Sequence, residues 1–159
     1  MLQKNKILKE KIFLKGFTLI EILLVIGIIS ILASVIIVAI NPARQFAQTR
    51  NTQRWSNVNT ILNAVNQYMI DNNGSLPSAI PTTTSTEICK TGAASCTSLI
   101  DLSVLTNSAI YITSMPVDPF CPTGCSAEGA GYTIFKDANG RVVVSSPNAE
   151  LGKTVSITR

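Results

Sequence analysis

One carboxylate lies inside a long apolar segment near the N-terminus of the sequence. From Phe17 to Ile40 the side chains are almost all apolar, and Glu21 is the one ionisable side chain among them. A charged group at bilayer depth costs on the order of 2.5–3.5 kcal/mol at a helix centre, so Glu21 needs a cationic partner. Cleavage after Gly16 would create such a cation, the α-amino group of Phe17. On a neighbouring helix shifted along its axis, this amine could meet Glu21 and set the register between packed copies.

The apolar segment is long enough to cross a membrane as a helix. At about 1.5 Å per residue, a helix from Phe17 to Ile40 is about 36 Å long, and a hydrocarbon core is about 30 Å thick. A secretory signal peptide would place small residues for cleavage after its apolar region, whereas here the apolar run continues. A cut is therefore expected before the run. The lysine-rich leader, which should stay in the cytoplasm, contains Lys4, Lys6, Lys9, Lys11 and Lys15 against one acid, Glu10.

The residues around this cut carry a family resemblance. The string Lys15-Gly16-Phe17-Thr18-Leu19-Ile20-Glu21 resembles the processing site of type IV pilins and type II secretion pseudopilins. The resemblance implies that a prepilin peptidase cuts after Gly16, that the new N-terminal Phe17 is N-methylated, and that Glu21 supports assembly. The competing interpretation is a plain signal anchor, in which the Glu21 carboxylate snorkels to the membrane surface.

Pro42 is the residue expected to bend the long helix. Its missing N–H leaves the carbonyl group four residues earlier without a partner. In the family the helix-bending proline falls one turn earlier, where this sequence has Val38. A glycine often found in the middle of the span is replaced by Ser30, with Gly27 nearby.

The net charge of the sequence comes from its leader. The 159 residues carry 13 basic and 9 acidic side chains, with no histidine. Five of the basic residues and one of the acids lie in residues 1–16, which leaves 8 of each sign on a cleaved chain. The basic balance therefore indicates membrane topology and not a nucleic-acid partner. Without histidine, no nucleophile–base pair stands out, so neither an enzyme nor a cofactor is expected.

The predicted fold class is α+β, with a long helix packed on a small antiparallel sheet, as in pilins. Apolar residues keep a helical spacing after Pro42, and Gly74 suits a C-cap, so one nearly continuous helix is predicted over 17–73. Asn139-Gly140 between two β-rich runs predicts a hairpin. The apolar stripe predicted to face the core comprises Phe46, Trp55, Val58, Ile61, Leu62, Val65, Tyr68 and Met69.

These features divide the sequence into three segments. Residues 1–16 are predicted to form a cleaved basic leader, 17–41 the membrane or filament-core half of the helix, and 42–159 an extracytoplasmic globular domain. Within this domain the predicted order is helix 42–73, a variable surface loop at 75–98, a short helix over Ser98–Asn107, and a sheet region at about 110–159.

Four cysteines lie in the segment predicted to be outside the cytoplasm, which favours disulfides. Pairing sequence neighbours joins Cys89 to Cys96 and Cys121 to Cys125. Four cysteines allow three connectivities, and a bridge between the two loops stays open. A four-thiolate zinc site is an alternative that these spacings fit poorly, and free thiols are a further one.

Three acidic residues, Asp118, Glu128 and Asp137, cluster in the C-terminal loops. Carboxylates are hard oxygen ligands, and some pseudopilins bind calcium in this region. The sequence contains no calcium-loop motif, so solvated turn carboxylates are the preferred interpretation and no metal is expected. Asp101 is interpreted as a charge at the N-terminus of the short helix.

The resulting hypothesis is a structural subunit of a type IV pilus-like filament. The resemblance implies a helical homopolymer, processing by prepilin peptidase, and contacts with an inner-membrane assembly platform, minor pilins and, before assembly, membrane lipid. The chain would be a single-pass protein of the cytoplasmic membrane with its N-terminus inside, and extracellular once assembled. Within the family, a minor pilin or a type II secretion pseudopilin is the alternative. Outside it, the alternative is a membrane-anchored extracytoplasmic binding module that does not polymerise.

Overall fold

The computed structural model describes residues 16–159, and the predictions for residues 1–15 of the leader lie outside the described residues. The chain divides into two compact units, one ending at Asn41 and the other being Pro42–Arg159. Each unit is described by itself.

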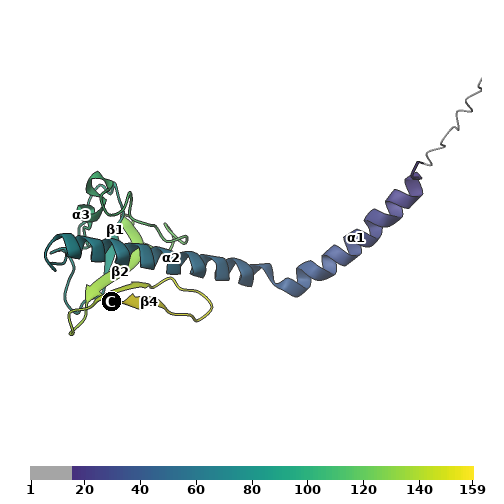
Figure 1. Ribbon diagram of the computed structural model, residues 1–159. Helices are drawn as coiled ribbons and strands as arrows, with labels where there is room; N and C mark the ends of the chain where they lie inside the picture. The colour runs from purple at the N-terminus through teal and green to yellow at the C-terminus, as the bar shows by residue number, and fades with distance from the viewer. Residues whose placement is uncertain (1–15) are drawn as a thin grey trace, which may run out of the picture. The chain divides into compact units, whose positions relative to one another are not determined.

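The division between the units coincides with a break between two helices, α1 (Leu19–Ile40) and α2 (Pro42–Asp71) (Figure 1). Asn41, at the break, has a left-handed φ of 51°. Pro42 has no N–H to continue the hydrogen-bond ladder of α1. The helix predicted to run almost continuously over 17–73 is therefore two helices, and a bend at Pro42 stays a prediction.

α1 forms a unit without a core of its own. Thr18 caps its N-terminus, because its Oγ1 accepts a hydrogen bond from the Glu21 N–H at 3.2 Å. A side-chain oxygen at this position satisfies one of the free N–H groups of the first turn. No residue of α1 is buried. By length and composition, α1 is able to cross a membrane.

α2 buries one face against a small sheet. Pro42 suits the first helical position, where its N–H is not needed and its φ is already helical. The helix ends at Asp71, and Asn73 and Gly74 follow with positive φ angles of 53° and 84°. The buried side chains recur every three or four residues. They are Ala47, Asn51, Arg54, Val58, Ile61, Leu62, Ala64 and Val65.

The predicted apolar stripe is wrong at Phe46 and Trp55, whereas Tyr68 packs against the core as predicted. Phe46 is 63% exposed and Trp55 is 39% exposed. At 3.6 residues per turn, these two positions lie about 180° apart around the helix, so one face cannot hold both. The buried positions of this half of α2 belong instead to Ala47, Asn51 and Arg54.

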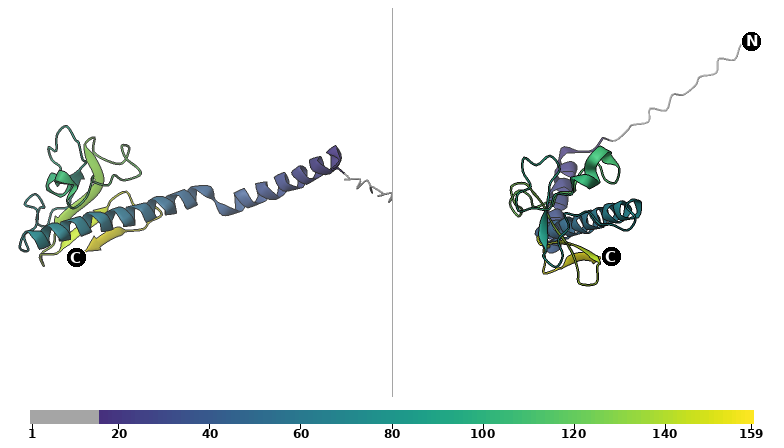
Figure 2. Two further views of the ribbon diagram at one scale, coloured as in Figure 1. Left: turned by 45° about the horizontal axis from the view of Figure 1, so that its top comes forward. Right: turned by 90° about the vertical axis from the view of Figure 1, so that its left-hand side faces the viewer.

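A four-stranded antiparallel sheet packs on α2 in the order β1-β2-β3-β4, and Figure 2 shows it beside the helix in two further views. α2 contacts β3 and β4. The predicted hairpin is confirmed, since Asn139-Gly140 lies in the turn between β2 and β3. The strands are β1 (Thr86–Cys89), β2 (Gly129–Lys136), β3 (Val142–Ser146) and β4 (Val155–Thr158).

The prediction that residues 75–98 form only a loop is wrong at β1. This strand pairs antiparallel with β2, with a register shift between Glu87 and Cys89. Ile88 is fully buried in the core. Short polar runs flank the strand in the sequence, and its antiparallel partner β2 lies much later in the chain.

The predicted helix over Ser98–Asn107 is shorter in the structure. It consists of α3 (Ser103–Thr106), which a 3-10 turn, η1 (Asn107–Ala109), follows directly. Asp101 precedes it, and its Oδ1 accepts a hydrogen bond from the Ser103 N–H at 2.8 Å. Leu102 and Leu105, by contrast, are buried in the core with the α2 side chains.

Candidate functional site

The residues of the predicted processing site lie at the start of α1. Gly16, Phe17 and Thr18 precede the helix without regular structure, and all three are exposed. A Cβ added to Gly16 would meet nothing within 4 Å. The peptide bond between Gly16 and Phe17 is therefore accessible from solvent in the single chain.

Glu21 lies in the first turn of α1, where the helix dipole favours a negative charge. In the part of the chain that the structure describes, no hydrogen bond or ion pair reaches its carboxylate. The hydroxyls deeper in α1 differ, because Ser30 Oγ donates to Ile26 O and Ser34 Oγ donates to Ile31 O, each at 2.7 Å. Hydroxyls bonded to their own helix are tolerated in lipid. Glu21 is thus the side chain of α1 that needs a partner from outside the helix.

Residues 15–37 match a known family model, the prokaryotic N-terminal methylation motif. This methylation motif supports a type IV pilin-like or pseudopilin protein. It contains Gly16, Phe17 and Glu21 together with most of α1, so the predicted resemblance to type IV pilins and pseudopilins is confirmed. No curated protein and no solved structure matches the chain. The motif and the exposed apolar α1 fit membrane anchoring of this pilin-like chain.

Two disulfides close loops in the unit Pro42–Arg159. Cys89 is bonded to Cys96, and Cys121 is bonded to Cys125. These are the pairs of sequence neighbours, and all four cysteines are used. No thiolate is left for a zinc site, so the zinc and free-thiol alternatives do not apply to this structure.

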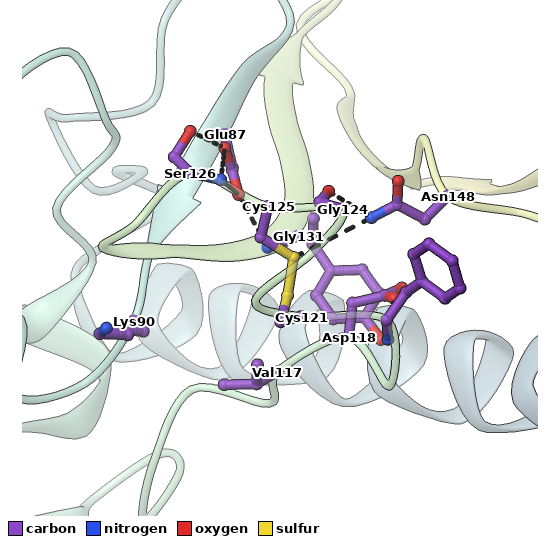
Figure 3. Close-up of a disulfide and its surroundings, with 12 residues drawn as sticks. Glu87, Lys90, Val117, Asp118, Cys121, Gly124, Cys125, Ser126, Gly131 and Asn148 are labelled. Atoms are coloured by element: carbon purple, nitrogen blue, oxygen red, sulfur yellow. Dashed lines mark hydrogen bonds between the residues drawn. A yellow bond between two sulfur atoms is a disulfide. The ribbon is translucent and has the colours of Figure 1, made fainter.

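The second disulfide packs against Gly131 of β2 (Figure 3). Gly131 has a φ of +79°, and an added Cβ would lie 2.6 Å from Asp118 Cβ and 2.7 Å from Cys125 Sγ. Its N–H donates to Glu87 Oε1 at 2.9 Å, and the Glu87 carboxylate also accepts hydrogen bonds from Ser126. Only glycine therefore fits between the disulfide loop and β1. The local sequence indicates neither this role of Gly131 nor that of Glu87.

The sequence patterns also do not indicate the buried ion pair between α2 and the turn before β2. Arg54 is fully buried and Asp118 is 2% exposed. Arg54 Nε and Nη2 donate to the two carboxylate oxygens of Asp118, at 2.8 and 3.1 Å, in a bidentate arrangement. Asp118 also accepts hydrogen bonds from Ser146 Oγ at 3.1 Å and from the Phe120 N–H at 2.8 Å. Both charges are thus fully hydrogen-bonded, as buried charges must be.

Glu150, in the connection between β3 and β4, joins this network. Its Oε2 accepts hydrogen bonds from Arg50 Nε and Arg54 Nη1, both at 2.7 Å. Asn51 adds two bonds to the Glu150 backbone, donating to its carbonyl at 2.8 Å and accepting from its N–H at 3.0 Å. The hydrogen bonds from Arg50 and then Arg54 lower the pKa of Glu150 to about 2. The β3–β4 connection is therefore held on α2 both by ion pairs of Glu150 and by the neutral hydrogen bonds of Asn51.

The three carboxylates considered for calcium are each paired with a different cation. In the described residues, no group of three or more His, Cys, Asp or Glu side chains is placed to hold a metal ion. Asp137 instead organises the hairpin turn, and the backbone N–H of Arg141 is the main cause that lowers its pKa. The pairs are Asp118 with Arg54, Glu128 with Lys90, and Asp137 with Arg141.

Proposed function

We propose that this chain is a structural subunit of a type IV pilus-like filament. The observation that carries the proposal is Glu21, a lone carboxylate in the first turn of a fully exposed apolar helix, inside a methylation motif. In this proposal the chain enters the cytoplasmic membrane as a prepilin, with residues 42–159 outside. A prepilin peptidase then cleaves after Gly16, and Phe17 becomes the methylated N-terminus.

A pair of charges would set the register between copies. Apolar helices in lipid gain little hydrophobic free energy by associating with one another. The α1 side chains are mostly Ile, Leu and Val, so close packing of these surfaces alone favours many registers almost equally. The Glu21 carboxylate is costly while unpaired, and it meets the Phe17 amine of a neighbouring copy in one register only. Moving α1 out of lipid requires work, which is why an inner-membrane assembly platform belongs to the proposal.

Features of the second unit support a position outside the cytoplasm. Its two disulfides fit an oxidising compartment. The exposed Thr- and Ser-rich segment at 82–85 and the two disulfide loops favour a pilus subunit over a secretion pseudopilin. Minor pilins of the same filament are therefore proposed as partners.

The test is Glu21→Gln, which removes the charge and keeps the shape of the side chain. We expect normal membrane insertion and processing but loss of surface filaments, counted by electron microscopy. Glu21→Asp, which keeps the charge, should retain part of the assembly. Ser30→Ala is the matched control, because that hydroxyl already bonds to its own helix. Normal filaments from Glu21→Gln would contradict the docking role.

N-terminal sequencing of the purified protein tests the processing step. The expected first residue is an N-methylated Phe17. A protein that keeps residues 1–16 and stays monomeric in native membranes would instead be an anchored binding module, and the proposal would be wrong.

A further inference from the structure

The turn after α2 contains an acceptor pattern for an N-linked sugar. Asn73-Gly74-Ser75 has the form Asn-x-Ser, in which x is not proline. In the whole sequence no other asparagine is followed two positions later by serine or threonine. We propose that Asn73 is a site of N-glycosylation, which goes beyond the proposed role as a filament subunit.

All three residues of this pattern are exposed. The turn is closed by its own backbone, because the Gly74 N–H donates to Met69 O at 2.8 Å and the Ser75 N–H donates to Asn72 O at 3.0 Å. These bonds are local. The turn therefore keeps its shape without help from the side chains of Asn73 and Ser75, and a modifying enzyme can reach it in the folded protein.

The two side chains that the pattern requires are also not used in hydrogen bonds of the described fold. Within residues 16–159, neither the Asn73 amide nor the Ser75 hydroxyl makes a hydrogen bond. The adjacent Asn72 differs, since its Nδ2 donates to Tyr68 O at 2.8 Å. Modification of Asn73 would thus break no contact of the fold, whereas modification of Asn72 would.

The space around the turn is open. A Cβ added to Gly74 would meet nothing within 4 Å. Gly74 also lines a surface depression of about 420 Å³, whose other walls include Leu76, Pro77 and Lys136. A sugar attached to Asn73 therefore has room beside the turn.

The hairpin turn between β2 and β3 provides an internal comparison. Asn139 is exposed and precedes Gly140, which has a positive φ of 82°, so this turn shares both features with the turn after α2. Arg141 follows where the pattern requires a hydroxyl. A sugar is therefore expected at Asn73 and not at Asn139.

The reaction is a group transfer from a sugar carried on a lipid diphosphate. Nδ2 of Asn73 forms a bond to the anomeric carbon, and the bond between that carbon and the diphosphate oxygen breaks. The lipid diphosphate leaves with the electron pair, and Nδ2 loses one proton to a base of the transferase. The donor is held in a membrane, and the proposed topology of the chain places the turn on the outer side.

The test uses the full chain isolated from its source cells, with mass spectrometry of its proteolytic peptides. We expect the peptide with Asn73 to carry the mass of one or more sugars and the peptide with Asn139 to carry none. Asn73→Gln and Ser75→Ala should each remove the added mass completely. Ser75→Thr, which keeps the hydroxyl, should retain it.

Ser75→Ala is the decisive variant, because it leaves Asn73 and its left-handed backbone unchanged. An unmodified Asn73 in the native chain, or added mass that persists in Ser75→Ala, would overturn the proposal. The result is independent of filament formation, since the added mass is measured equally well on membrane-bound copies that never assemble. A variant that assembles without sugar, or carries sugar without assembling, separates the two proposals.

Discussion

α1 and the unit Pro42–Arg159 differ in where the polar and charged side chains find their bonding partners. In the second unit, Arg54 is bonded to Asp118 and Glu150, which lie in segments far away in the sequence. In α1, the serine hydroxyls bond to their own helix, and the Glu21 carboxylate has no partner among the described residues. The charges of the second unit are thus paired within its own fold. The exposed surface of α1, by contrast, is left to be covered by lipid or by another protein.

The apolar side chains show the same contrast. Four of those on α2 are fully buried, but no residue of α1 is buried. The stability of the second unit should therefore be insensitive to substitutions in α1. Trp55, the one tryptophan of the sequence, lies in α2, so its fluorescence reports the unfolding of this unit. The four buried side chains are Val58, Ile61, Leu62 and Val65.

The largest effect is expected from breaking the buried ion pair. Arg54→Met should lower the free energy of unfolding by about 3–5 kcal/mol, because it leaves the Asp118 carboxylate buried without a cation. The measurement is urea unfolding of the full chain in detergent, followed by Trp55 fluorescence. Arg141→Met is the matched control, since Arg141 is 57% exposed in its pair with Asp137 and should cost only about 0–1 kcal/mol. Equal losses in the two variants would show that burial does not decide the strength of the pair.

A pair of leucine substitutions tests the contrast between the helices directly. Leu62→Ala in α2 should cost about 2–5 kcal/mol, because it removes a fully buried side chain from the core. Leu32→Ala in α1, where the leucine is 59% exposed, should leave the same urea transition unchanged. If Leu32→Ala destabilised the second unit as much as Leu62→Ala, α1 would be part of its fold and the contrast would be wrong.

The N-terminal part of the molecule could be predicted residue by residue because its signals are local. The apolar run and the methylation motif that contains Gly16 and Glu21 are both defined by close neighbours in the sequence. The hairpin could be predicted for the same reason, since Asn139-Gly140 encodes a tight turn without help from the rest of the chain.

The features that could not be predicted depend on contacts between distant residues. An arginine on an amphipathic helix is normally exposed, and Arg54 is buried only because Asp118, 64 positions later, lies opposite it. Glu87 contacts Gly131, 44 positions later, and β1 exists as a strand only because β2 pairs with it. In each case a partner that no local pattern identifies creates the environment of the residue.

The smallest effect on stability is expected from lowering the pH, which protonates Glu150. Hydrogen bonds from Arg50 and then Arg54 lower the pKa of Glu150 from 4.5 to about 2. As the pH falls, the unfolded chain therefore takes up a proton on Glu150 before the folded chain does. The contribution of Glu150 to stability is complete above about pH 5, and it is lost as the pH falls from about 4.5 to about 2.

Glu150→Gln should consequently lower the urea midpoint of Trp55 fluorescence at neutral pH and approach the native chain at about pH 2. Arg50→Gln removes the largest cause of the shift, so its pH dependence should be intermediate. Glu21→Gln should follow the native chain at every pH, because the role proposed for that carboxylate is in assembly and not in the fold of the second unit. If Glu150→Gln and the native chain lost the same stability on acidification, charge would not hold the β3–β4 connection. Its attachment to α2 would then rest on the hydrogen bonds between the Asn51 side chain and the Glu150 backbone, and the contrast with α1 would be one of burial alone.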